Sequence, residues 1–294
     1  MSRRYDTISF LTDYGTVDEF VGVVKSVVRD IAAHVTVIDI THEVPVFDVR
    51  AGSLTLARAI SYVPSGVVLA VVDPGVGTSR KSIAVEVGNG EGVLVGPDNG
   101  LLAPAVAMAG GAGRAVVLSN VEYHLVAPGT TFAGRDIFAP AAAHLCNGVD
   151  LYELGEPIDA ELLMPGVIPL PRTEGNALVA EVLWVDRFGN CQLNLGPSEV
   201  EHLGDQVRIT VGELAGAPIT RIAKLSANFS ELGVGAIGLV TDSYGMLALC
   251  LDRRSAAEEL HIGPSDQVVL EAVTESNGVG STSVSSPVNL RINR

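Results

Sequence analysis

Two residues of opposite charge, Asp73 and Arg80, stand at the ends of a loop rich in glycine and proline. The loop follows an apolar run, residues 66–72, whose Val and Leu residues between Gly and Pro predict a central β-strand. Asp73 would then lie at the carboxyl end of a strand, where open α/β sheets bind ligands. Arg80 can fold back onto its carboxylate as a charge-assisted partner. A ligand-binding loop and an ordinary turn with a surface ion pair both fit this pattern.

Carboxylates follow four of the strand-like runs in the first half of the chain. A single Asp or Glu after a strand is ordinary, because turns favour short polar side chains. Four such residues at one edge of a single sheet would instead line a polar ligand cleft at the strand ends. These residues are Asp13, Glu43, Asp73 and Asp98.

A second group of candidate binding residues follows a strand in the second half of the chain. Asp186, Phe188 and Asn190 lie close together there, around Gly189. An aromatic ring beside hydrogen-bonding groups suits a flat heteroaromatic base. The same residues also fit a hairpin turn, because Asp, Gly and Asn favour turns. Both interpretations stay open on the residues alone.

The elements that would position the first group alternate between strands and helices. Helices are predicted from Asp18 to Ile31, from Val49 to Tyr62 with Asp48 as N-cap, and from Ala139 to Asn147. The alternation predicts an α/β domain with a mainly parallel sheet and helices on both faces. The predicted strands cover residues 7–12, 35–40, 66–72, 81–86 and the start of 92–100.

The composition and periodicity of the sequence change near residue 156. Four prolines and little periodicity in residues 156–176 indicate a linker. Short strands without intervening helices follow, which predicts a small β-barrel or sandwich. They cover residues 177–185, 206–211, 236–240, 246–251 and 267–271. We therefore predict an N-terminal α/β domain over residues 1–165, a β-barrel-like domain over 166–275 and a flexible tail over 276–294.

Composition excludes several classes of protein. A net charge of -15 over 294 residues argues against a nucleic-acid binder, which needs a basic face. Apolar runs stop short of the ~20 residues of a membrane span, and the first residues contain no apolar signal core. We therefore expect a cytoplasmic protein with no membrane partner. Cys146, Cys191 and Cys250 form no C-x-x-C pair and fit buried reduced thiols.

Common cofactor and nucleophile motifs are absent from the sequence: G-x-G-x-x-G at a strand–helix junction, the P-loop and the G-x-S-x-G elbow. Four histidines have no neighbours at ligand spacing, so we expect structural roles and no metal. They are His42, His144, His202 and His261. His124 lies in a strand-like segment and is considered as a catalyst.

Five segments together resemble the S-adenosylmethionine hydroxide adenosyltransferases, relatives of the fluorinase and chlorinase. The segments are residues 10–15, 73–80, 97–100, 131–136 and 186–190, and the resemblance runs in order from about Thr7 to about Leu270. It implies a larger N-terminal α/β domain, a smaller C-terminal β-barrel domain and a homotrimer. In such trimers each site lies between the N-terminal domain of one subunit and the C-terminal domain of its neighbour.

The resemblance also implies a reaction, in which water or hydroxide attacks the ribose 5′ carbon of S-adenosylmethionine and yields adenosine and L-methionine. No cofactor or metal is expected, because the sulfonium is already a good leaving group. The enzyme must align and partly desolvate the nucleophile. In related enzymes that use halide, the acid and the arginine of the 73–80 segment are lost, since a carboxylate would repel the anion. Their retention here favours water or hydroxide.

The residue roles implied by the resemblance divide into catalysis and binding. Asp73 and Arg80 would position and polarise the water. Asp13 would hold the ribose hydroxyls, and Phe47 would stack near the sugar and adenine. The remaining expected binding residues are Phe132 and Gly134 in the 131–136 segment, Asp186, Phe188 and Asn190 at the methionine end, and, by a looser match, Ser243 and Asp252 at the adenine pocket.

One residue departs from the family pattern. Relatives that use water typically read Thr-Phe-His-Gly-Arg-Asp where this chain has Ala133 in place of the histidine. An alanine side chain neither accepts nor relays a proton. Three outcomes are compatible with this change: slower hydrolysis, a histidine supplied from elsewhere such as His124, or a different nucleophile. A halide-using adenosyltransferase that makes 5′-halo-5′-deoxyadenosine and a non-catalytic binder of S-adenosylmethionine or adenosine are therefore the alternative functions.

Overall fold

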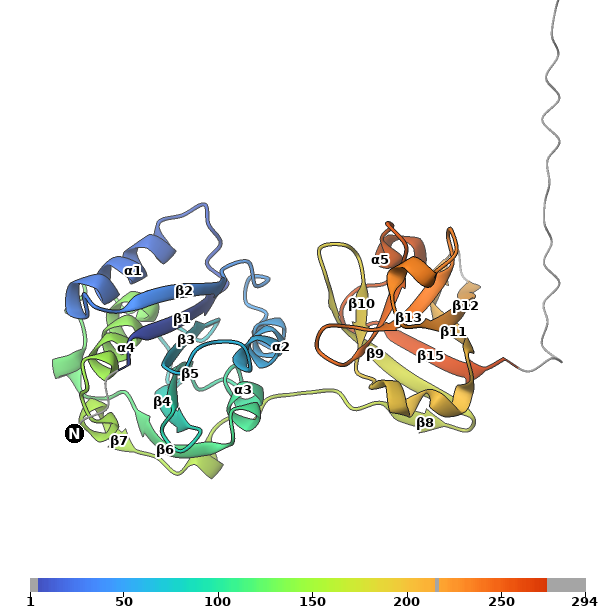
Figure 1. Ribbon diagram of the computed structural model, residues 1–294. Helices are drawn as coiled ribbons and strands as arrows, with labels where there is room; N and C mark the ends of the chain where they lie inside the picture. Colours follow the sequence, from blue (N-terminus) through green and yellow to red (C-terminus); the bar gives the residue numbers. More distant parts are fainter. Residues whose placement is uncertain (1–4, 215–216, 274–294) are drawn as a thin grey trace, which may run out of the picture. The chain divides into compact units, whose positions relative to one another are not determined.

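The computed structural model describes residues 5–214 and 217–273, which form two compact units divided between Pro169 and Leu170 (Figure 1). The first unit is an α/β unit and the second consists mainly of strands. The predicted flexible tail, residues 276–294, lies outside the described residues. Within the described part of the chain, no helix combines the length and apolar character that crossing a bilayer requires.

The first unit contains a seven-stranded sheet in the order β2-β1-β3-β5-β4-β6-β7. Strands β2, β1, β3 and β5 pair in parallel, whereas the pairings from β5 through β4 and β6 to β7 are antiparallel. The turn between β4 and β5 places Gly88, Asn89 and Gly90 at positive φ, as tight hairpins require. The strands are β1 Thr7–Thr12, β2 Thr36–Thr41, β3 Val67–Val71, β4 Ser82–Val87, β5 Gly92–Pro97, β6 Ala112–Val117 and β7 Glu156–Pro157.

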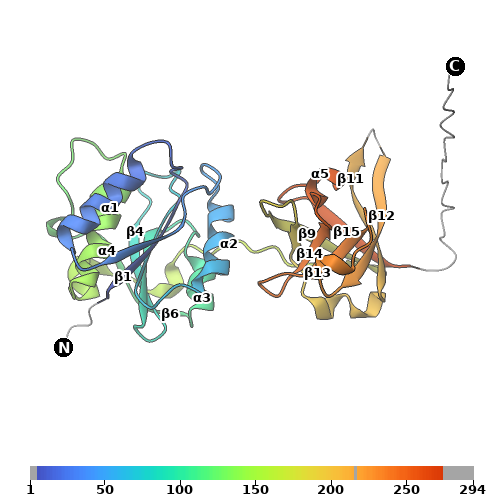
Figure 2. The same ribbon diagram turned by 45° about the horizontal axis from the view of Figure 1, so that its top comes forward.

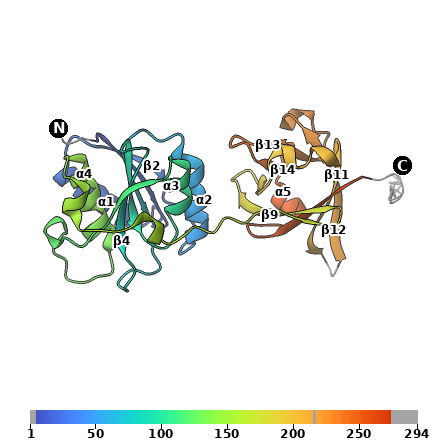
Figure 3. The ribbon, with the colours of Figure 1, turned by 90° about the horizontal axis from the view of Figure 1, so that it is seen from below.

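Helices cover both faces of this sheet (Figure 3). Side chains alternate along β3: Leu69 packs into the core shared with α1 and α4, and Ala70 into the core shared with α2 and α3. Burial on both faces explains why the run is apolar without interruption. The predicted α/β fold with a sheet rich in parallel strands is confirmed. The helices are α1 Phe20–Ile31, α2 Val49–Ile60, α3 Ala103–Met108 and α4 Ala139–Cys146, preceded by a π-helical turn η2, Gly134–Phe138.

Local capping follows the prediction for α2. The Asp48 carboxylate accepts a hydrogen bond from the Ala51 N–H at 2.8 Å, which satisfies a backbone donor at the start of the helix. The connections contain short 3₁₀ turns. These are η1 Val121–Tyr123, η3 Leu151–Leu154 and η4 Ala160–Leu162 in the first unit, and η5 Pro197–Glu199, η6 Glu201–Leu203 and η7 Phe229–Glu231 in the second.

The second unit is a closed barrel of seven strands (Figure 2). The ladder runs β10-β14-β13-β12-β11-β15-β9, and pairing of β9 with β10 closes it, while β8 adds to β9. Of the two predicted alternatives, a small barrel or a sandwich, the barrel is therefore correct. The elements are β8 Arg172–Glu174, β9 Ala177–Val185, β10 Cys191–Leu193, β11 Gln206–Leu214, β12 Ala217–Ser226, β13 Ile237–Thr241, β14 Leu247–Leu251, α5 Ala256–Leu260 and β15 Gln267–Ala272.

Candidate active site

A cavity of about 330 Å³ opens at the carboxyl ends of β1, β2 and β3 in the first unit. Three loops after these strands and the segment leading into η2 form its wall. Asp13 and Tyr14 come from the loop after β1, Phe47 from the loop after β2, and Asp73 from the loop after β3. The carboxyl ends of parallel strands are where α/β sheets bind ligands. The cavity is therefore our candidate active site.

The charged pair at this site is buried. Arg80 Nε donates to Asp73 Oδ1 at 3.0 Å and Nη2 donates to Oδ2 at 2.5 Å, so the contact is bidentate. The two side chains are 10% and 6% exposed, and the alternative of a surface ion pair is wrong. Two neighbours complete the environment of the guanidinium: Ser82 Oγ accepts from Nη1 at 2.8 Å, and the Phe138 ring lies 5.4 Å from Cζ.

Burial and neighbouring charge set the ionisation of two groups in the site. Desolvation raises the pKa of Asp73 above its ordinary value, and Asp13 adds to this, while Arg80 opposes it. Desolvation also raises the pKa of Tyr14, reinforced by the charges of Asp13 and Asp73 and opposed by that of Arg80. The Tyr14 phenol therefore stays protonated at neutral pH.

The loop after β2 is tied to the loop after β1 through Asp13. The Oδ2 atom of Asp13 accepts a hydrogen bond from the Phe47 N–H at 2.9 Å. Phe47 has φ +66°, a strained conformation for a bulky residue, and the residue is 68% exposed beside the cavity. Strained residues of this kind concentrate at ligand sites. The hydrogen bond to Asp13 holds the backbone that presents the Phe47 ring.

An aromatic cluster forms the opposite part of the wall. The Phe132 ring contacts the rings of Tyr14 and Phe20 at centroid distances of 5.8 Å and 5.1 Å. Next to it, Gly134 has no room for a side chain, because a Cβ atom there would lie 2.2 Å from the Tyr14 hydroxyl oxygen. Ala133 is buried and also lines the cavity. Tyr14 and Phe20 were not assigned roles from the sequence; the position of Tyr14 directly after Asp13 was the available signal.

The predicted cleft with four carboxylates is wrong, because only two of them line this cavity. Asp98 Oδ1 accepts from the Met164 N–H at 2.8 Å and borders a different, largely apolar cavity beside α3. Glu43 Oε1 accepts from Thr16 Oγ1 at 3.1 Å. Both carboxylates follow strands, as expected, but the loops that carry them turn to other neighbours.

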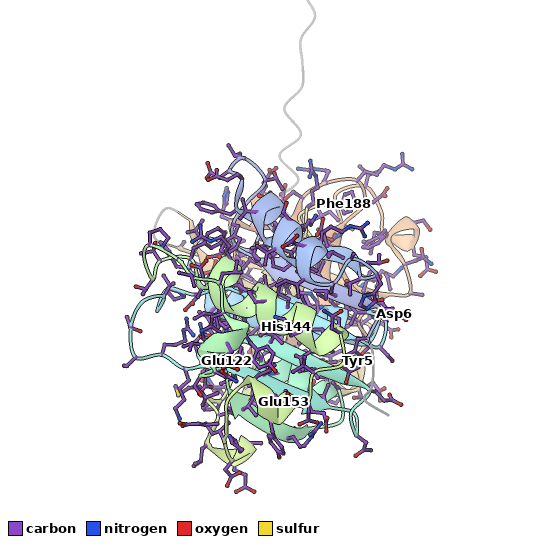
Figure 4. All side chains as sticks on the ribbon, turned by 90° about the vertical axis from the view of Figure 1, so that its left-hand side faces the viewer. Tyr5, Asp6, Glu122, His144, Glu153 and Phe188 are labelled. Atoms are coloured by element: carbon purple, nitrogen blue, oxygen red, sulfur yellow. The ribbon has the colours of Figure 1, made fainter. Side chains whose placement is uncertain are left out.

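His124 does not line the cavity. It follows the 3₁₀ turn η1 and not a strand, which corrects the sequence prediction. Burial lowers the pKa of its imidazole, and a hydrogen bond with the Leu118 backbone partly offsets this by raising the pKa. The His144 ring meets the Tyr123 ring edge to face, and the Tyr123 hydroxyl donates to Glu153 at 3.2 Å. His144 and Glu153 are labelled in Figure 4. His124 is therefore not placed to replace the histidine missing at Ala133.

The candidate residues of the second unit form a preshaped hairpin turn between β9 and β10. Asp186 Oδ1 accepts from the N–H groups of Phe188 and Asn190 at 2.8 and 2.9 Å, and Oδ2 accepts from Asn190 Nδ2 at 2.7 Å. The hairpin interpretation is thus correct. Phe188 is 78% exposed in this turn. These contacts fix the loop without using every lone pair of the carboxylate.

The two remaining candidates lie on other segments of the barrel. Ser243 is exposed in the turn between β13 and β14, and Asp252 follows β14. The segment after Asp252 contacts the hairpin, because the Ala257 N–H donates to the Gly189 carbonyl at 3.0 Å. A Cβ atom at Gly189 would lie 2.1 Å from Ser255 Oγ, so this contact requires glycine. Within the described residues, no group of three or more His, Cys, Asp or Glu side chains could hold a metal ion.

Comparison with protein families decides the classification. Residues 8–155 match the SAM hydroxide adenosyltransferase N-terminal domain, and residues 180–269 match the corresponding C-terminal domain. The chain belongs to this family. The resemblance inferred from the five sequence segments is thereby confirmed.

Individual relatives agree with the family assignment. An (R)-S-adenosyl-L-methionine hydrolase from Salinispora tropica is 41% identical, over 90% of this chain and 97% of the relative. One of the same name from Thermus thermophilus is 38% identical over 86% and 94%. A fluorinase from Actinoplanes sp. is 27% identical over 82% and 89%. A crystal structure of an uncharacterized conserved protein from Thermotoga maritima superposes with a TM-score of 0.81 at 35% identity, over 90% of this chain and 99% of that one.

The buried pair predicts a large and pH-dependent effect of removing its cation. Arg80→Met leaves the Asp73 carboxylate buried without a partner, and we expect the free energy of unfolding to fall by about 3–5 kcal/mol at neutral pH. The loss should shrink on acidification, because removing Arg80 raises the pKa of Asp73 further and the protonated acid buries no charge. Denaturant unfolding of the native protein and the variant across acidic and neutral pH measures both effects.

Arg114→Met is the matched control for this prediction. Arg114 pairs with two carboxylates, Glu86 at 2.8 Å and Asp150 at 3.0 Å, but its side chain is 38% exposed. We expect a loss of about 1 kcal/mol or less, because water screens an exposed pair. Equal losses for the two variants at neutral pH would contradict the buried character of the Asp73–Arg80 pair.

Proposed function

We propose that this protein hydrolyses S-adenosyl-L-methionine to adenosine and L-methionine. The observation that carries the proposal is the buried, bidentate Asp73–Arg80 pair, whose Asp73 carboxylate lines the same cavity as Asp13. Membership of the family and relatives named (R)-S-adenosyl-L-methionine hydrolase at 38–41% identity support the same reaction. The proposed substrate is therefore S-adenosylmethionine, and the enzyme is a hydrolase.

The reaction is a substitution at the ribose 5′ carbon. A water oxygen forms a bond to C5′ while the C5′–S bond breaks, and its electron pair stays on sulfur, so methionine leaves as a neutral thioether. The proton lost from the attacking water passes through the Asp73 carboxylate to solvent. Arg80 keeps this carboxylate in one orientation, which gives the alignment that such a reaction needs. The proposal requires no cofactor, because the sulfonium needs no further activation to leave.

Binding of the nucleoside is assigned to the loops around the pair. Asp13 uses one carboxylate oxygen for the Phe47 N–H, and the other is left to accept from a ribose hydroxyl. The exposed Phe47 ring supplies a face for the sugar and adenine. Phe132 closes the apolar part of the wall, and Gly134 lines the cavity beside it.

Water is favoured over halide as the nucleophile by the electrostatics of the site. Asp73 carries its negative charge at the cavity wall with little solvent to screen it, and a halide would meet repulsion there. Ala133 is the feature that favours halide, because it lacks the proton-accepting histidine. The fluorinases among the relatives are also more distant, at 26–27% identity.

We further propose a homotrimer in which the second unit of one subunit completes the site of its neighbour. The support is the state of the hairpin: its turn is preformed by Asp186, and its Phe188 ring is exposed with no apolar cover of its own. In this arrangement Asp186 and Asn190 bind the amino and carboxylate groups of methionine, Phe188 packs on the substrate, and Ser243 and Asp252 border the adenine. The three buried free cysteines suit the reducing cytoplasm.

The first prediction of this proposal concerns products. Purified protein incubated with S-adenosylmethionine should release adenosine and methionine in equal amounts, as chromatography would show, without dependence on added chloride or fluoride. Asp73→Asn should lower kcat by about 10²–10⁴-fold, because the group that accepts the proton is lost. A halide-dependent 5′-halo nucleoside would favour the halide-using alternative, and tight binding without turnover would favour a binding protein.

The second prediction concerns pH. Because hydrolysis needs ionised Asp73, kcat/KM should fall as the pH drops through the pKa of this group, with a midpoint above the ordinary Asp value of about 3.9. In Arg80→Gln the midpoint should move to higher pH, since Arg80 lowers the pKa of Asp73 while burial and Asp13 raise it. An acid limb at the ordinary value, or one that does not move in the variant, would contradict this role of Asp73.

The third prediction tests the shared site. Asp13→Ala and Asp186→Ala should each be nearly inactive alone, because one damages the nucleoside end and the other the methionine end. In trimers that contain both variants, one of the three sites should combine two intact halves and regain activity, which is about a third of the native activity per trimer. Activity of purified mixed trimers, with the molecular mass from light scattering, measures this. Absence of recovery in verified mixed trimers would place the whole site in one subunit.

A further inference from the structure

The Tyr14 hydroxyl is a polar group in the cavity wall that no contact accounts for. Its ring is held by the Phe20 and Phe132 rings, each at a centroid distance of 5.8 Å, and its N–H donates to Thr12 Oγ1 at 3.2 Å. The hydroxyl oxygen has no hydrogen-bond partner among the residues that the structure describes. Because Tyr14 lines the cavity, this oxygen is available to a molecule bound there.

The position of this hydroxyl is fixed relative to the segment that contains Ala133. A Cβ atom built on Gly134 would lie 2.2 Å from the Tyr14 oxygen and 3.2 Å from Cζ. The phenol thus lies directly against the residue that follows Ala133, and both Tyr14 and Ala133 face the same cavity. The absence of a side chain at Gly134 makes this approach possible.

The ionisation of Tyr14 shows which charges act on the phenol. Its pKa is raised by burial first, then by Asp13 and Asp73, and lowered by Arg80. The phenol is therefore within electrostatic reach of the whole charged set, and it is neutral at working pH. A neutral phenol offers two lone pairs as acceptors and one O–H as donor.

We propose that the Tyr14 hydroxyl holds the attacking water together with the Asp73 carboxylate, which Arg80 orients, where Ala133 supplies only a methyl group. This inference rests on the proposed function. One hydrogen of the water is donated to the Asp73 carboxylate and the other to the Tyr14 oxygen, which directs an oxygen lone pair at C5′. When the C–O bond forms, the proton on the Asp73 side is the one transferred; the Tyr14 phenol keeps its own proton, and the remaining hydrogen becomes the 5′ hydroxyl hydrogen.

Tyr14→Phe removes the oxygen and keeps the ring that packs between Phe20 and Phe132. We expect kcat for hydrolysis to fall by about 10- to 100-fold, while KM and the affinity for adenosine change by less than about threefold, because the lost contact is made to the water and not to the nucleoside. The thermal midpoint should stay close to that of the native protein. Tyr152→Phe, which removes a hydroxyl outside the cavity, is the matched control and should leave kcat unchanged.

A second variant tests whether Tyr14 does the work that the missing histidine would do. Ala133→His should raise kcat more in the Tyr14→Phe protein than in the native protein, because the imidazole then supplies the acceptor that was removed. Equal effects in the two backgrounds would mean that the positions act independently, which contradicts the inference. Thermal midpoints of all four proteins show that each is folded.

The outcomes separate this inference from the proposed function. If the native protein hydrolyses S-adenosylmethionine and Tyr14→Phe retains the native kcat, the inference is overturned and the function stands. If Tyr14→Phe instead loses adenosine affinity together with kcat, Tyr14 binds the nucleoside, and the inference is overturned as well. If the native protein forms no adenosine from the substrate, the proposed function itself fails and the inference with it.

Discussion

The site depends on one interaction, the bidentate contact of Arg80 with the buried carboxylate of Asp73. A buried carboxylate without a partner is costly, and the guanidinium matches both of its oxygens at once. The pair therefore holds an anion at the wall of a cavity that would otherwise exclude it. The pair also draws together the two ends of the loop after β3. The same two residues therefore position the nucleophile and stabilise the loop. Asp13 and Tyr14 are arranged around this fixed charge.

Much of the fold follows from sequence patterns because local and long-range requirements agree. The apolar run that forms β3 is buried on both faces of the sheet, and such burial selects uninterrupted Val, Leu and Ala. Strand β1 and the N-cap of α2 at Asp48 were predicted for equally local reasons. Strand β12 was missed, because most of its residues are exposed and only Ile219 and Ala223 are buried, so its sequence shows no apolar alternation. Pairing with β11 and β13, and not its own periodicity, makes β12 a strand.

The site was predicted less completely, since a sequence shows which residue follows a strand but not where its loop turns. Asp13 and Asp73 meet in one cavity, whereas Asp98, in an equivalent position, turns to the Met164 backbone. The depth of the Asp73–Arg80 pair depends on packing by Phe138, which is far from both in the chain. The closeness of Tyr14 to Gly134 likewise arises from tertiary packing between two loops. These are contacts at long range, and no local pattern specifies them.

The central claim is that water held by Asp73 and Arg80 attacks the ribose 5′ carbon. Hydrolysis in water enriched in oxygen-18, with mass spectrometry of both products, tests it most directly. We expect one atom of the heavy isotope in the 5′ hydroxyl of adenosine and none in methionine, with the formation of labelled adenosine slowed by about 10²–10⁴-fold in Asp73→Asn. Unlabelled adenosine, or labelled adenosine formed at the native rate by Asp73→Asn, would contradict this account.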